Sequence, residues 1–192
     1  MKLPLPSFAL TVALLLSASA LGATERLVTI DQKKSRIEYH VDAPLASFTG
    51  TLTAYETSIT ADPSRAQPVT RAEVRFRFTD LRSDNVKRDQ NMRDWQDTEQ
   101  FPECVYTLTA LEPAGAPNLF NAKGQFIFHG QARELVFPVV ISSAADGLIS
   151  IKGDALIDTR TFGAPPLRRW GLLKVDPVVK VTIALLGSTS AP

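Results

Sequence analysis

Hydrophobic and polar residues alternate along most of the chain, and residues 72–78 show this most clearly. There the apolar side chains of Val74, Phe76 and Phe78 are separated by charged residues. Successive side chains of a β-strand point to opposite faces, so this spacing places the apolar side chains on one face and the charged ones on the other. The pattern predicts a strand of an antiparallel sheet that has one buried and one solvated face.

The same two-residue period returns in shorter runs over much of the remaining chain. These runs cover residues 37–41, 106–108, 126–128, 137–141, 149–151, 155–157 and 179–185. Residues typical of turns, mainly Gly, Pro and Asp, separate them. Many short strands with almost no helical periodicity predict a single all-β domain, either an antiparallel sandwich or a barrel, with about eight to ten strands.

Residues 84–97 are the exception, because their charged side chains recur at helical spacing. Asp89, Arg93 and Asp97 follow one another at intervals of four residues, which places them on one side of a helix. Opposite charges at this spacing attract each other weakly. We therefore expect one short, solvated helix that is held by ion pairs among its own residues.

The ends and the apolar side chains of this helix can also be predicted. Ser83 and Asp84 stand just before it, and both residue types cap helix starts. Met92 and Trp95 are its large apolar residues, so they are the side chains available to pack inward or to touch an apolar ligand. We expect the helix to cover one end of the domain with these two residues.

The first 23 residues have the pattern of a secretion signal. Lys2 precedes an apolar run from Phe8 to Leu16, and small residues follow up to Ala23. The apolar run is too short to cross a membrane. We expect a cleaved signal peptide over residues 1–23 and an exported domain over residues 24–192, with no stable membrane insertion.

The charge balance and the single cysteine narrow the range of partners. Lys2 is the one charged residue of the leader, so the rest of the chain has 20 basic and 20 acidic residues. A neutral domain of this kind gives no reason to expect a nucleic acid or another polyanion as partner. Cys104 has no second cysteine with which to form an internal disulfide, so the fold must depend on its core, and we expect Cys104 to be a small buried residue.

Sequence motifs of nucleophilic, phosphate-binding or dinucleotide-binding sites are missing. His40 and His129 lie far apart in the chain, and with one cysteine they do not supply a zinc site, so we expect neither a metal nor a cofactor. His129 precedes Gly130 and is expected to form a hydrogen bond at a turn. One alternative remains, a lipid-modifying hydrolase or isomerase that uses carboxylates as acid and base. Its candidates are Asp89, Asp94, Asp97 and Glu99.

Four segments, in this order, resemble the YceI-like family of bacterial periplasmic proteins. The first is RDQNMRDWQDTEQFP (residues 88–102), which carries the family's Arg-Asp pair, a second Arg and an aromatic-Pro end. The second is GQFIFHGQARELVFPV (124–139), with its His-Gly turn. The third is GDALIDTRTFG (153–163), and the last is VVKVTIAL (178–185).

This resemblance implies an extended, lipocalin-like antiparallel barrel of eight strands with a helical crossover, here near residues 84–97. It also implies a small-molecule partner, a long amphiphilic lipid such as a polyisoprenoid or the isoprenoid tail of a quinone, which the protein binds, sequesters or transports in the periplasm without catalysis. A homodimer is compatible with these features. A further hypothesis is a barrel filled by side chains, which acts as an interaction or stress module without a ligand.

Aromatic residues that fall on one side of their strands are candidates for the wall of a lipid site. Together with the two apolar residues of the helix they are Phe48, Phe76, Phe78, Met92, Trp95, Phe126, Phe128 and Phe162. A polar head group at the mouth would require basic side chains. The basic candidates are Arg88, Arg93, Arg160 and, as the preferred pair, Arg168 and Arg169 beside Trp170.

Overall fold

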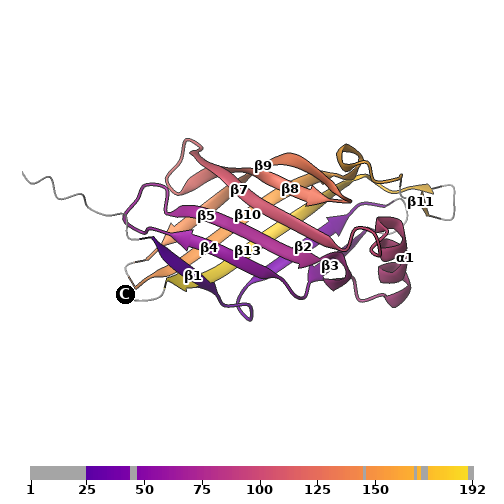
Figure 1. Ribbon diagram of the computed structural model, residues 1–192, viewed down its shortest axis with the longest axis horizontal. Coiled ribbons are helices and arrows are strands. Elements are labelled where there is room, and N and C mark those ends of the chain that lie inside the picture. Colours follow the sequence, from indigo (N-terminus) through magenta and orange to yellow (C-terminus); the bar gives the residue numbers. More distant parts are fainter. Residues whose placement is uncertain (1–24, 44–46, 145, 167, 170–172, 190–192) are drawn as a thin grey trace, which may run out of the picture.

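The computed structural model of the chain describes residues 25–43, 47–144, 146–166, 168–169 and 173–189. The described residues form thirteen strands, one α-helix and two short 3₁₀ helices (Figure 1). The α-helix is α1 (Val86–Gln96), and the 3₁₀ helices are η1 (Phe78–Asp80) and η2 (Thr159–Phe162). The strands are β1 (Arg26–Ile30), β2 (Arg36–Val41), β3 (Phe48–Leu52), β4 (Glu56–Ala61), β5 (Val69–Arg77), β6 (Leu81–Arg82), β7 (Glu103–Pro113), β8 (Leu119–Phe128), β9 (Gln131–Ser143), β10 (Leu148–Asp158), β11 (Arg168–Arg169), β12 (Leu173–Lys174) and β13 (Val178–Thr189). No helix within the described residues is long and apolar enough to cross a membrane.

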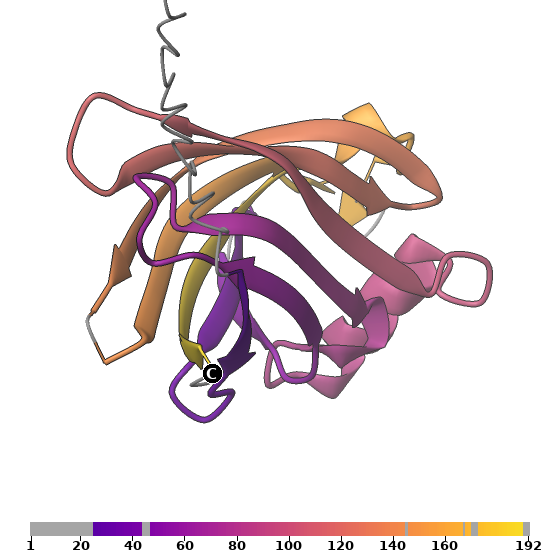
Figure 2. The same cartoon turned by 60° about the vertical axis from the view of Figure 1, so that its left-hand side comes forward.

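The main sheet closes into an antiparallel barrel. Its order is β1, β4, β5, β7, β8, β9, β10 and β13, and pairing of β1 with β13 completes the circle. The segments β2, β3 and β6 extend three of these strands, because β13 pairs with β1 at one end and with β2 at the other. Counting each of β1–β2, β3–β4 and β5–β6 as one interrupted strand gives eight, which curve around a common axis (Figure 2). The predicted barrel of about eight strands is confirmed.

Hydrogen bonds accompany two of the interruptions. Between β1 and β2 the carboxylate of Asp31 accepts hydrogen bonds from the backbone N–H groups of Lys33 and Lys34, at 3.1 and 3.3 Å. An Asp side chain that bonds to the backbone in this way turns the chain. Between β3 and β4 the backbone N–H of Thr53 donates to the carbonyl oxygen of Asp80 at 3.0 Å. The chain therefore turns at Asp31, while the bond of Thr53 holds the end of β3 beside the residue that precedes β6.

Strand β5 has the two faces that its alternation predicts. Val74 and Phe76 point into the barrel, where both line its interior. On the outer face the guanidinium of Arg75 donates to the carboxylate of Glu103 on β7, at 3.1 Å. The strand ends one residue earlier than expected, because Phe78 begins η1, but the Phe78 side chain stays buried.

The hairpin between β8 and β9 turns at His129 and Gly130, whose φ angles are 47° and 69°. Two consecutive residues with positive φ are typical of a type I′ turn. A Cβ atom at position 130 would lie 2.5 Å from the ring of Phe101, so the position needs glycine for space as well. His129 was expected to form a hydrogen bond of the turn, but its Nδ1 lies 3.1 Å from the carbonyl oxygen of Gln96 and so joins the hairpin to the end of α1.

Helix α1 exists where it is predicted, but a different residue caps it. The side-chain oxygen of Asn85 accepts a hydrogen bond from the backbone N–H of Arg88 at 2.9 Å, so Asn85 is the cap. Asp84 has a positive φ of 58° and lies outside the helix. The predicted cap at Ser83 or Asp84 is wrong, because the Ser83 hydroxyl is already bonded to Asp89.

The expectation of ion pairs along α1 is also wrong. Among the described residues, no salt bridge within 4.0 Å involves any residue of α1. Asp89 is buried and accepts hydrogen bonds from Ser83, while Asp94 accepts one from Gln90 at 2.7 Å. Helical spacing alone does not show which charged residue a neighbouring segment will cover, and here the segment before the helix covers Asp89.

The packed core occupies the half of the barrel far from α1. Buried residues of β1, β4, β8 and β10 form a continuous cluster there, including Val28, Ile59, Phe120 and Ile149. Figure 1 shows β1 and β4 toward one end of the barrel and α1 at the other. Side chains therefore fill the half of the interior that lies away from α1.

Candidate functional site

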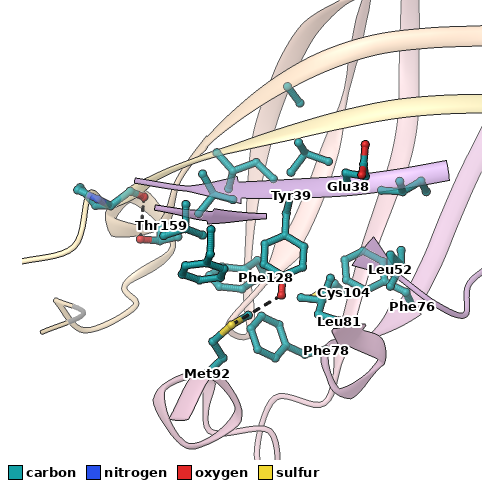
Figure 3. Close-up of a pocket in the computed structure, with 18 of the residues that line it drawn as sticks. Glu38, Tyr39, Leu52, Phe76, Phe78, Leu81, Met92, Cys104, Phe128 and Thr159 are labelled. Atoms are coloured by element: carbon teal, nitrogen blue, oxygen red, sulfur yellow. Dashed lines mark hydrogen bonds between the residues drawn. The ribbon is translucent and has the colours of Figure 1, made fainter. Parts of the chain in front are cut away.

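The half of the barrel next to α1 is hollow. It holds a cavity of about 1010 Å³, whose wall comes from most of the barrel strands and from α1. The wall is mainly apolar, and Figure 3 shows Tyr39, Phe76, Phe78 and Phe128 pointing into this space, with Met92 beside Tyr39. A hollow interior of this size contradicts the hypothesis of a barrel filled by side chains.

Most of the apolar residues that the sequence singles out meet at this cavity. Those that line it are Phe48, Phe76, Phe78, Met92, Trp95, Phe126 and Phe128. Phe162 does not line it. Its buried ring lies behind Phe126 and Phe128, with ring centroids 5.6 Å from each, and so supports the wall from outside. The alternation identified the inward faces correctly, whereas Phe162 belongs to η2, where that rule does not apply.

Two tyrosines of the wall were not predicted, and each lies over a glycine of the next strand. Tyr39 on β2 covers Gly50 on β3, and a Cβ atom there would overlap the tyrosine ring. Tyr106 on β7 covers Gly124 on β8, where a Cβ atom would lie 2.6 Å from the ring. Without a side chain beneath it, each ring stays close to the wall, which leaves the space beyond it open.

The hydroxyl of Tyr39 has a weak partner. It donates to the sulfur of Met92 at 3.8 Å, which ties the wall to α1 (Figure 3). Burial raises the pKa of Tyr39 to about 12, and the nearby carboxylate of Asp89 adds to the rise. Burial also raises the pKa of Tyr106. Both phenols are therefore neutral at ordinary pH.

Cys104 lies in the same wall. Its side chain is 1% exposed, which confirms the predicted burial. Burial raises the pKa of its thiol to about 12, and the adjacent Glu103 adds to the rise. The thiol is therefore protonated at ordinary pH, and a protonated thiol is a poor nucleophile.

The polar part of the wall comes mainly from α1 and the residue before it. Asn85, Lys87, Arg88 and Asn91 all line the cavity, and all but Arg88 are exposed to solvent. The cavity thus has a polar edge at the end of the barrel that α1 covers. An amphiphile would place its polar group at this edge and its apolar part further inside.

Arg88 is held firmly at this edge by Ser83. Its Nε donates to the Ser83 hydroxyl at 2.8 Å and its Nη2 to the Ser83 carbonyl at 2.6 Å. The guanidinium also lies 4.2 Å from the ring centroid of Phe48, at a distance suited to a cation–π contact. Ser83 in turn donates to Asp89 from its backbone N–H, at 3.0 Å, and from its hydroxyl. One serine thus fixes both residues of the Arg-Asp pair.

Trp95 joins α1 to the segment after η2. Its Nε1 donates to the carbonyl oxygen of Pro165 at 2.7 Å, and its ring centroid lies 6.0 Å from that of Phe128. The prediction that Met92 and Trp95 cover one end of the barrel agrees with this placement, because both side chains line the cavity from the helix.

The preferred basic pair lies at the border of the described residues. Arg168 and Arg169 form β11, which pairs with β12, but only their backbone is described, and Trp170 lies outside the described residues. Their role in binding a head group stays a prediction. Arg160 forms two hydrogen bonds with the carboxylate of Asp158, at 2.9 and 2.6 Å, so its guanidinium is already occupied.

The carboxylates of the enzyme hypothesis do not meet at the cavity. Within the described residues, none of the four lines it. Asp89 faces Ser83, and Asp97 ends the helix with a φ of 54°. No group of three or more potential metal ligands occurs among the described residues either. His40 instead bonds to Thr49 at the surface, with 3.0 Å between Nδ1 and Oγ1.

Several known proteins share this fold. The family model described as YceI-like domain matches residues 28–186. The crystal structure of Burkholderia cenocepacia BcnA superimposes with a TM-score of 0.70 at 19% identity, covering 82% of this chain and 99% of that one. A polyisoprenoid-binding domain from Saccharophagus degradans gives 0.68 at 14% identity, covering 86% and 99%. Campylobacter jejuni YceI gives 0.67 at 16%, covering 77% and 88%. A search of curated proteins finds no match.

Proposed function

The chain belongs to the YceI-like family, and we propose that it binds a long-chain amphiphilic lipid inside its barrel and carries or sequesters that lipid in the periplasm. The observation that carries this proposal is the apolar cavity of about 1010 Å³ with one polar edge. Burial of each methylene group stabilises a complex by about 0.8 kcal/mol. A long hydrocarbon chain therefore binds in such a cavity with few polar contacts.

The ligand class that we propose is an isoprenoid, either a polyisoprenoid or the isoprenoid tail of a quinone. The solved domain from Saccharophagus degradans is described as polyisoprenoid-binding, and its fold matches this one over most of the chain. The aromatic wall made by Phe76, Phe78 and Phe128 suits a branched, unsaturated chain, because aromatic rings offer broad apolar contact. The proposed periplasmic location rests on the leader over residues 1–23.

A binding protein fits the site better than an enzyme does. Besides its apolar groups and the polar edge at α1, the cavity wall contains two neutral phenols and a protonated thiol. Its two carboxylate residues already have partners, because Glu38 forms a salt bridge with Arg36 at 2.9 Å and Asp176 accepts a hydrogen bond from the backbone N–H of Val178 at 2.8 Å. Acid and base chemistry needs two titrating groups beside one bond. The carboxylates of residues 89–99 lie elsewhere, so the site offers burial of a chain rather than bond cleavage.

Native mass spectrometry of the protein purified from its own periplasm tests the proposal directly. We expect a copurified isoprenoid mass, which organic extraction removes. A matched pair of variants then locates the lipid. Ile183→Trp places a large ring in the cavity, whereas Ala184→Trp places the same ring on the outer face, because consecutive side chains of β13 point to opposite faces. The first variant should lose the lipid and the second should keep it. Equal retention by both variants would place the lipid outside the barrel.

A further inference from the structure

Several neighbouring strands lack a hydrogen-bonded ladder over part of their length, as β1–β4 and β5–β7 do beside the packed core, and the stretch without a ladder between β9 and β10 lies beside the cavity. Strands β9 and β10 pair only from Val139 with Gly153 to Ser143 with Ile149. Beyond Val139, β9 pairs with β8 alone and β10 pairs with β13 alone. We call the unpaired stretch, residues 134–138 of β9 facing residues 154–158 of β10, the seam.

Pro138 explains why the ladder stops there. Its carbonyl oxygen would lie 2.6 Å from a Cβ atom at Gly153, so this carbonyl faces β10. In an antiparallel strand the N–H and C=O of one residue point toward the same neighbour. Proline has no N–H, so β9 lacks a donor toward β10 at the position where pairing ends.

The seam lies directly over the cavity. Leu135 and Phe137 of β9 line the cavity from one side of the seam, and Ala155 and Ile157 of β10 line it from the other. Along this stretch the two strands meet through side chains, without a backbone ladder between them. Such contacts can part without breaking any backbone hydrogen bond.

The outer side of the seam is apolar as well. Val136 is 50% exposed and Leu156 is 64% exposed, and Pro138 beside them is exposed too. Continuing the β9–β10 register past Val139 and Gly153 places Val136 opposite Leu156, one on each side of the seam. An apolar path thus runs from the outer surface, between the strands, to the cavity.

Carboxylates beside the seam are neutralised by basic partners. Asp154 lies 3.5 Å from Lys180 and Glu134 lies 3.5 Å from Lys123, while Asp158 pairs with Arg160. The apolar side chains of the seam are therefore bordered by paired carboxylates and by two exposed basic residues, Arg133 and Lys152, which form no salt bridge among the described residues. Because exposed apolar side chains form its centre, the seam suits a neutral lipid surface better than a partner of strong charge.

We propose that the protein exchanges its lipid with a neutral lipid surface through this seam, with Val136, Pro138 and Leu156 touching the surface while the chain passes sideways between β9 and β10. This inference rests on the proposed function. At the α1 end, by contrast, the Trp95–Pro165 hydrogen bond and the bonds of Ser83 hold the helix in place. Beside the seam, one hydrogen bond joins β9 to η2, from Nε of Arg133 to the carbonyl oxygen of Thr161 at 3.0 Å.

Bridging the seam tests the proposal. In Val136→Cys/Leu156→Cys a short bismaleimide would join the two sides, and mass spectrometry would confirm the bridge. Buried Cys104 is shielded from the reagent. Transfer of a pyrene-labelled polyprenol from phosphatidylcholine vesicles should slow at least about tenfold, while the final occupancy stays the same, because a closed gate changes rates and not affinity. The control is Val140→Cys/Lys152→Cys, bridged in the same way across the intact ladder, which should transfer at the normal rate.

A second pair of variants needs no bridge. Val136→Glu/Leu156→Glu should slow transfer from vesicles but leave binding of polyprenol from detergent solution unchanged, because only contact with the surface is disturbed. Leu27→Glu, on β1 and 57% exposed, is its control. Unchanged transfer in both seam variants would overturn the proposal. So would faster transfer in Trp95→Phe together with no effect of the bridge, because the lipid would then pass by α1. If the unmodified protein bound no polyprenol, the proposed function itself would fail.

Discussion

The ring of Tyr39 lies over Gly50, its direct partner across β2 and β3, and occupies the volume that a side chain at position 50 would need. The glycine therefore determines where the tyrosine lies. Because the ring rests on bare backbone, it stays near the wall and can bond to Met92. The width of the cavity thus depends on a residue that contributes no side chain to it.

Gly50→Ala should destabilise the protein by about 1–3 kcal/mol, because overpacking forces the Tyr39 ring away from the wall. The displaced ring should also weaken lipid binding. Urea unfolding measures the first effect, and titration with a polyprenol measures the second.

The matched control for this substitution is Thr51→Ala on the same strand, which should change stability by less than about 0.5 kcal/mol. Combining Gly50→Ala with Tyr39→Leu should cost less than the sum of the two single changes, because leucine has no ring to collide with. Additive costs would show that Gly50 acts through the backbone and not through Tyr39.

Asp89→Ala should destabilise the protein by about 1–3 kcal/mol, since it leaves the buried N–H and hydroxyl of Ser83 without their acceptor. We expect faster amide hydrogen exchange over residues 84–97 as the helix loosens. Asp94→Ala removes an exposed carboxylate from the same helix and should have little effect. Equal losses in the two variants would show that the hydrogen bonds from Ser83 to Asp89 contribute nothing to stability.

Side-chain alternation predicts the barrel because each strand has one wet and one dry face, as β5 shows with Arg75 outside and Phe76 inside. The type I′ turn at His129 and Gly130 is also visible in the sequence, since glycine permits positive φ. Such local rules act within a few residues. They therefore predict elements well and contacts between elements poorly.

The hollow interior is not predictable in this way. Whether the aromatic side chains fill the barrel or line it depends on register across strands, such as Tyr106 over Gly124. The burial of Asp89 likewise depends on Ser83, which lies outside the helix. Pro138 marks an unpaired strand edge in the sequence, but only the fold shows that the edge lies over the cavity.

Cys104 should make the stability of the protein decrease with alkaline pH. Its pKa rises from 9.0 to about 12 on burial, so between these values the folded state keeps a proton that the unfolded state has lost. The stabilisation is complete below pH 9 and is lost as the pH rises toward 12, because stability falls with pH wherever the folded state binds more protons. Tyr39 adds to the loss above about pH 10.

Urea unfolding measured from pH 8 to pH 11 tests this dependence. Between pH 9 and pH 10, the free energy of unfolding of Cys104→Ala should fall by less than that of the unmodified protein. This difference does not depend on how stable the variant is at pH 8. A thiol reagent at pH 8 should react with Cys104 only after the protein unfolds, because the thiol is buried and protonated. Rapid reaction of the folded protein would show that the wall beside Cys104 opens.

Arg88 should select lipids by head group, because its guanidinium is fixed at the polar edge of the cavity by Ser83 and by the ring of Phe48. Arg88→Gln should reduce the affinity for a prenyl diphosphate by about tenfold or more, since hydrogen bonds to charged groups contribute about 1.5–3 kcal/mol. Affinity for the neutral prenol of the same length should change much less.

The ratio of these two affinities is the quantity to measure, because any general loosening of the helix lowers both alike. Arg160→Gln is the matched control, since Asp158 already occupies that guanidinium, and it should leave the ratio unchanged. An unchanged ratio in Arg88→Gln as well would remove Arg88 from head-group recognition. Arg168→Ala/Arg169→Ala, measured in the same assay, would then decide whether β11 supplies the charge.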